Sequence, residues 1–76
     1  MTYISEFIKM SNTYQKLGEK IRTARKAKKI TQEKLAELVG VDVRTIVAVE
    51  AGKRNPTLKT INKIAKALDV QASSLL

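Results

Sequence analysis

The sequence predicts an all-α fold, and three observations support this. Breakers divide the chain into five or six short segments with helical periodicity, and none has the alternating pattern of a strand. Residues that cap helices stand at the start of several of these segments: Thr31, Asp42 and Thr57. The chain has 76 residues, which is the size of one domain with a small core.

The first predicted helix covers residues 14–28. Three apolar residues recur on one face at spacings of four and three: Leu17, Ile21 and Ala24. Asn12 stands three residues before Gln15, and this pair predicts the start of the helix. The residues before it, 1–13, are expected to be an extension that is either disordered or a short extra helix, with Ile4, Phe7 and Ile8 as its apolar residues.

The second predicted helix begins after Thr31 and ends at Gly40, where a left-handed backbone costs glycine little. Its expected apolar side is formed by Leu35, Ala36 and Leu38. The third helix, VRTIVAVE, is expected to begin after Asp42 and to close before Gly52.

The last predicted helix is TLKTINKIAKAL, which follows the basic turn GKRNP. Its apolar stripe has a period of 3.6 and is expected to be core: Leu58, Ile61, Ile64, Ala65 and Leu68. The segment ASSLL behind it is too short to be a stable helix unless it packs on the rest.

Composition excludes several classes of function. The chain has no cysteine and no histidine, so we expect no disulfide, no zinc site of these ligands and no cofactor. No histidine or cysteine is therefore available as a base or nucleophile and the carboxylates are scattered, so we predict that it is not an enzyme. No apolar run approaches the roughly 20 residues that span a bilayer, and we expect a cytoplasmic protein. A net charge of +8 favours polyanions as partners.

The two middle helices carry a spacing with a steric reason. Ala36 lies four residues before Gly40, and two helices that cross steeply through a short turn need a small side chain and a tight turn at these places. Ile46 and Val49 follow at positions that face inward from the second of these helices.

At these residues the chain resembles the Cro/C1-type helix-turn-helix family of DNA-binding domains, also called the XRE family. The resemblance covers residues 14–76 and is carried by ITQEKLAELVGV, by the ending Glu50-Ala51-Gly52, by GKRNPTLKTINKIAKAL and by the final V-x-x-x-x-L. It implies a five-helix, lambda-repressor-like fold whose third helix enters the major groove. Members are mostly bacterial and phage transcription regulators, and they usually bind near-palindromic operators as dimers.

The resemblance also implies roles for single residues. Four outward positions of the third helix would read base edges: Val43, Arg44, Val47 and Ala48. Five positions would hold phosphates: Gln32, Lys53, Arg54, Asn55 and Thr57. Arg25 and Glu50 would form a buried ion pair between the first and third helices.

Two residues depart from the family pattern. Lys29 stands where relatives commonly have glycine, so it either adopts a left-handed backbone at some cost or the helix ends differently. Asp42 stands where they have serine or threonine, and it would repel phosphates unless it caps the helix or accepts a hydrogen bond from cytosine N4.

The predicted function is that of a small, sequence-specific DNA-binding transcription regulator, repressor-like and homodimeric. The alternative is an antitoxin that binds a protein toxin and represses its own operon. The apolar residues Val43 and Val47 leave this open, because they suit thymine methyl groups, a partly buried core or a protein partner.

Overall fold

The computed structural model describes the backbone of residues 2–76 and the side chains from residue 13 onward. The described chain forms four α-helices and one short 3-10 helix, in the order α1 (Thr2–Ala27), α2 (Gln32–Val39), α3 (Val43–Glu50), α4 (Leu58–Leu68) and η1 (Ala72–Ser74). The all-α prediction is therefore confirmed. The predicted fifth helix is the single turn η1, because ASSLL is too short for more.

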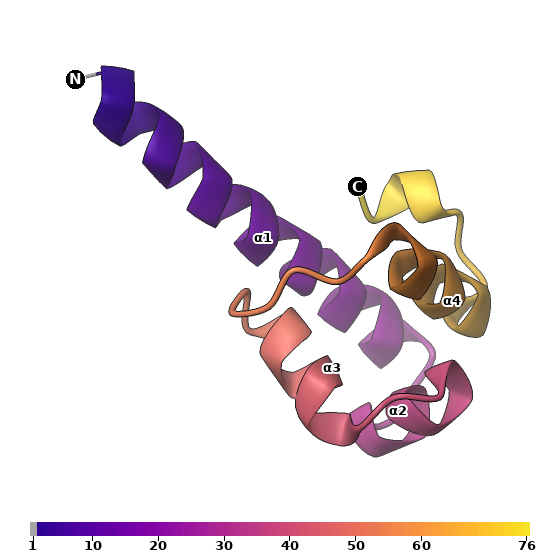
Figure 1. The fold of residues 1–76 in the computed structure, drawn as a ribbon. Coiled ribbons are helices and arrows are strands. Elements are labelled where there is room, and N and C mark those ends of the chain that lie inside the picture. Colours follow the sequence, from indigo (N-terminus) through magenta and orange to yellow (C-terminus); the bar gives the residue numbers. More distant parts are fainter. Residues whose placement is uncertain (1) are drawn as a thin grey trace.

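Helix α1 differs from the predicted helix at its start. It runs without a break from Thr2, so Asn12 and Gln15 lie inside it and mark no beginning. Figure 1 shows the N-terminal half of α1 extending away from the other helices, and the molecule measures 42 × 23 × 21 Å. The division into an extension and a domain stays a prediction, and contacts of Ile4, Phe7 and Ile8 lie outside the described side chains.

The core lies where the C-terminal half of α1 meets the other helices. Its largest fully buried side chains come from all four α-helices and from the residue after η1: Ile21, Leu35, Ile46, Val49, Ile64, Leu68 and Leu75. Leu75 lies directly after η1, and its burial holds that turn against the core. The predicted apolar stripes supply most of this core, as their helical periodicity requires.

Two residues of those stripes are not in the core. Leu38 is 51% exposed and Leu58 is 69% exposed, although both were expected on a buried face. Leu38 lies at the rim of a shallow hollow that it shares with Lys63, Lys66 and Ala67 of α4, and Leu58 is the first residue of α4. An apolar stripe predicts which face of a helix points to the core. How much of that face is buried depends on which helices pack against it.

The helix ends follow the sequence closely. Thr31 and Thr57 cap α2 and α4, since their hydroxyl oxygens accept hydrogen bonds from the backbone N–H of Lys34 and Thr60. Lys29 has φ of +58°, so the first of its two alternatives holds: it ends α1 in a left-handed conformation. This costs a non-glycine residue on the order of 1–2 kcal/mol.

Candidate nucleic-acid interface

The turn between α2 and α3 sets the direction of α3. Gly40 has φ of +82°, and its backbone N–H donates to the carbonyl oxygen of Ala36 at 2.8 Å. The N–H of Val41 donates to the same oxygen at 3.0 Å. These two bonds close α2 and reverse the chain within three residues. Ala36 is buried, which fits the small side chain predicted at the crossing of the helices.

Helix α3 begins at a strong cap. Asp42 has an extended backbone, and its Oδ1 accepts a hydrogen bond from the N–H of Arg44 at 2.8 Å. Ile46 and Val49 point into the core and are each 1% exposed. The side of α3 that bears Arg44 and Val47 therefore faces away from the core.

The four candidate base-reading residues differ in exposure. Arg44 and Val47 are exposed, the latter by 45%, whereas Val43 and Ala48 are half-buried. Val43 packs against the edge of the core, so the core alternative for this residue holds in part. Val47 lies free on the outer face, at the distance of one turn from Val43.

The side chain of Arg44 is exposed, but its guanidinium is bound to the carboxylate of Asp42. Its Nε donates to Asp42 Oδ1 and its Nη2 donates to Asp42 Oδ2, both at 3.1 Å. The hydrogen bonds from Arg44 lower the pKa of the Asp42 carboxyl to about 2, so this residue is ionised at neutral pH. Arg44 and Asp42 thus form a bidentate ion pair on the outer face of α3, at its first turn.

The candidate phosphate-binding residues lie at two places. Lys53, Arg54 and Asn55 are exposed in the turn after α3, and Arg54 Nη1 donates to Thr45 Oγ1 at 3.3 Å. This contact brings the basic turn beside α3. Thr57 is also exposed, and its hydroxyl serves as the cap of α4.

Gln32 is placed differently from the basic turn. Its side chain is half-buried, and its Nε2 donates to Glu50 Oε1 at 3.1 Å. Gln32 is the first residue of α2, so its backbone N–H lies in the first turn of a helix, where N–H groups have no partner within the helix. These groups suit an anion such as a phosphate.

A buried ion pair connects α1 to the end of α3. Arg25 Nε donates to Glu50 Oε2 at 2.7 Å and Arg25 Nη2 donates to Glu50 Oε1 at 3.0 Å. Both residues are only 8% exposed. Arg25 Nη1 also donates to the carbonyl oxygen of Ile30, so a single guanidinium ties α1, α3 and the chain before α2 together. The pair implied by the resemblance is present in this geometry.

Gly18 is a positioning residue that the sequence analysis did not single out. A Cβ at this position would lie 2.5 Å from the carbonyl oxygen of Val49 and 2.6 Å from that of Glu50. The backbones of α1 and α3 therefore approach each other so closely that only glycine fits. The sequence did offer a signal for this close approach, because Gly18 stands inside a helical pattern. Glycine costs a helix about 1 kcal/mol relative to alanine, so a glycine there suggests that packing requires it.

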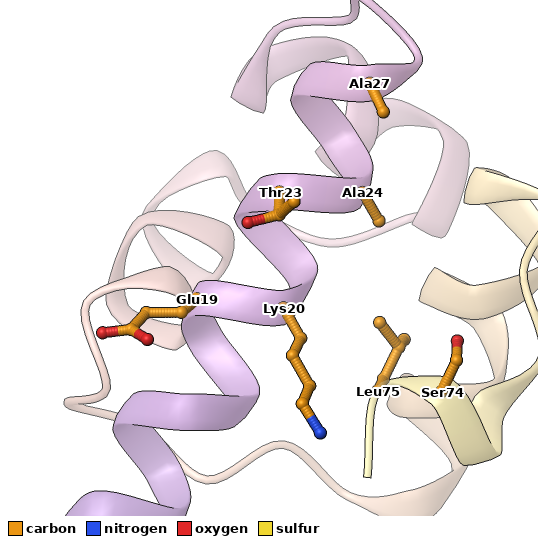
Figure 2. Close-up of a pocket in the computed structure, with 7 residues that line it drawn as sticks. All are labelled: Glu19, Lys20, Thr23, Ala24, Ala27, Ser74 and Leu75. Carbon is orange, nitrogen blue, oxygen red and sulfur yellow. The ribbon is translucent and has the colours of Figure 1, made fainter.

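The described surface also has hollows away from the outer face of α3. One of these hollows has a volume of about 400 Å³. Figure 2 shows that its lining comes from α1, including Lys20 and Ala24, and from the C-terminal turn with Leu75. Within the described part of the chain, no three His, Cys, Asp or Glu side chains are grouped so that they could hold a metal ion. No helix among the described residues is both long and apolar enough to cross a membrane.

Comparison with known proteins gives a consistent result. The helix-turn-helix family model matches residues 21–75. An uncharacterised HTH-type transcriptional regulator of Methanothermobacter thermautotrophicus is 50% identical over 48 residues, which are 63% of this chain and 70% of the relative. The immunity repressor protein of Bacillus phage phi105 is 33% identical over 60 residues, which are 79% of this chain but only 42% of the repressor.

A solved structure extends the similarity to the fold. The crystal structure of the restriction-modification controller protein C.AhdI from Aeromonas hydrophila superposes with a TM-score of 0.80 at 41% sequence identity. The match covers 83% of this chain and 96% of the controller protein.

Proposed function

Because the chain belongs to the helix-turn-helix family and is a DNA-binding transcription regulator, we propose that it represses transcription by placing α3 in the major groove of a near-palindromic operator. Repression is favoured by the similarity to a phage immunity repressor, and a small regulator by the similarity to a controller protein. A cytoplasmic location, where the DNA is accessible, is part of this proposal.

One observation carries the assignment of α3. Its outer face is framed by an exposed arginine at the first turn and by the basic turn Lys53-Arg54 after the last turn. Arginine is the side chain best suited to guanine, through two hydrogen bonds to O6 and N7. Val47 and Ala48, between these charges, offer only methyl groups, which suit the thymine methyl. Base reading and phosphate binding thus fall to different residues of one surface.

The experiment separates these two roles. Arg44→Ala should remove base discrimination worth about 1–3 kcal/mol at one position of each half-site, and binding of unrelated DNA should fall less. Lys53→Ala and Arg54→Ala should weaken all duplexes alike and flatten the slope of log K against log salt by about one unit per lost contact in each subunit.

The titration compares a duplex selected by the protein from fragmented genomic DNA with a scrambled duplex, at several salt concentrations. Lys66→Ala on α4 is the matched control, because it removes the same charge from an exposed site outside this surface. Equal losses on both duplexes for Arg44→Ala would make Arg44 a phosphate contact. If Arg44→Ala affects neither duplex, α3 does not lie in the groove.

A homodimer is the second part of the proposal, since a near-palindromic site has two equal halves. Leu58 and Leu76 are exposed by 69% and 64%, and both line an apolar hollow of about 390 Å³ that also includes Leu17 and Pro56. The N-terminal half of α1, which extends beyond the core, is the other candidate contact (Figure 1). Sedimentation of Leu58→Lys and of a chain beginning at Met10 distinguishes them, because only the variant that removes the contact should become monomeric.

One observation favours the alternative function as an antitoxin. Val47 is exposed on the outer face, and an exposed valine next to the half-buried Val43 also suits an apolar protein surface. Val47→Lys would block such a partner. Loss of toxin neutralisation by Val47→Lys in a cell that carries an adjacent toxin gene would support the antitoxin, whereas a change in DNA binding alone would support base reading by Val47.

A further inference from the structure

The contact between Asp42 and Arg44 divides the guanidinium of Arg44 into two edges. The edge formed by Nε and Nη2 is bound to the two carboxylate oxygens of Asp42. The guanidinium has five N–H donors in a fixed planar fork, and this pairing uses two of them. The edge formed by Nη1 and the second N–H of Nη2 has no partner among the described residues.

The unpartnered edge has the geometry that guanine needs. Guanine presents O6 and N7 side by side in the major groove, and two parallel N–H groups of one arginine can bind them. An arginine that reaches the base with Nη1 and Nη2 keeps Nε and the other side of Nη2 for a carboxylate. Asp42 can therefore hold Arg44 while Arg44 reads a base.

The charge of Asp42 affects the other ligand of arginine, the phosphate. A lone arginine on this face would bind any phosphate within reach, without regard to sequence. A carboxylate 3.1 Å from its nitrogen atoms cancels much of that charge at a distance and repels phosphates itself. Short hydrogen bonds to a base edge are less affected, because they depend on the direction of the N–H groups.

We propose that Asp42 is a specificity-determining positioning residue, which holds Arg44 for end-on recognition of guanine and reduces its use as a general phosphate contact. The proposal rests on the proposed function of α3. It adds a role for Asp42 that is separate from its role as the cap, since the cap uses only Oδ1 as acceptor for the backbone. Arg44 is 89% exposed, so without Asp42 its side chain would sample many rotamers.

The variant Asp42→Asn separates the two roles. Asparagine caps a helix as well as aspartate does, so α3 should keep its start. Its amide group presents one oxygen and one NH2, and the NH2 cannot accept a hydrogen bond from Nη2. Asp69→Asn is the matched control, because it removes the same charge from a side chain 90% exposed at the end of α4, and asparagine tolerates the left-handed backbone there.

The measurement is selection from a pool of random-sequence duplexes, followed by titration of the selected and scrambled duplexes. The wild type and Asp69→Asn should prefer guanine at one position of each half-site by about 10- to 100-fold, the range expected for a bidentate contact. Asp42→Asn should lose most of this preference and bind the scrambled duplex more tightly than Asp69→Asn does. In an Arg44→Ala background, Asp42→Asn should no longer change any base preference. Melting curves verify that the cap is retained.

Three outcomes overturn the proposal. If Asp42→Asn keeps the full guanine preference, Asp42 does not position Arg44. If Asp42→Asn changes a base preference even in the Arg44→Ala background, Asp42 reads a base itself, as an acceptor for cytosine N4. If Arg44→Ala leaves the selected sequence unchanged, then the proposed role of α3 fails together with this one. In the first two cases the proposed function stands.

Discussion

The ion pair between Arg25 and Glu50 should be the most sensitive point of the fold. Glu50→Ala leaves a buried guanidinium without its carboxylate, and only the bond to the Ile30 carbonyl remains. Removing one partner of a buried pair costs about 3–5 kcal/mol. A domain of this length is stable by roughly 4–11 kcal/mol in total. The melting temperature should therefore fall by at least about 12 °C, at 4–8 °C for each kcal/mol.

The assay is thermal unfolding followed by circular dichroism, with a matched exposed pair as control. Lys34 and Glu37 are 3.6 Å apart, but their side chains are 51% and 73% exposed, so Glu37→Ala should cost about 0–1 kcal/mol. The double variant Arg25→Met with Glu50→Leu should be more stable than either single loss, because no buried charge stays unpaired. If Glu50→Ala melts like Glu37→Ala, the pair contributes nothing and the reasoning is wrong.

Three further predictions concern α1 and the cap of α3. Gly18→Ala should destabilise by about 1–3 kcal/mol in urea unfolding, because the clash with two carbonyl oxygens outweighs the roughly 1 kcal/mol that alanine gains in a helix; a stabilised variant would refute the close approach. A chain beginning at Met10 should keep the fold and most of its melting temperature, since the described core begins at Leu17; an unfolded product would contradict this. The pKa of Asp42 is lowered to about 2 from an unfolded value of 3.8, so its stabilisation is present above pH 4 and is lost as the pH falls from about 4 to 2. Asp42→Asn should therefore lack this acid-dependent loss, and melting curves at several pH values in that window would test it.

Local signals in the sequence predicted most of the helix ends. Thr31, Asp42 and Thr57 cap the helices because a side-chain oxygen two or three residues from a free N–H needs no distant partner. Gly40 ends α2 for an equally local reason, its left-handed backbone. The predicted start of α1 was wrong. Asn12 and Gln15 form a weak signal, and no glycine or proline before them interrupts the helix.

Burial and side-chain hydrogen bonds between helices depend on residues far apart in the sequence, so local signals did not predict them. The exposure of Leu38 and Leu58 depends on which helices cover them, and a periodic stripe does not contain that information. The bond of Gln32 to Glu50 joins residues 18 positions apart, and its geometry depends on the crossing of α2 and α3. The bond of Arg54 to Thr45 spans 9 positions and depends on how the turn after α3 folds back beside that helix. The Arg25–Glu50 pair was expected only because the family resemblance implied it.

The inner and outer sides of α3 differ in how strongly they are held by other residues. Its inner side is fixed by the core residues Ile46 and Val49 and by Glu50, which is bound from both α1 and α2. On its outer side, Val47 is exposed and outside the core, so substitutions at this proposed base-reading position should cost little stability. Asp42 is the exception, because one of its oxygens caps the helix and both bind Arg44. Serine, threonine or asparagine would preserve the cap, but only a carboxylate can hold the arginine by two bonds at this position.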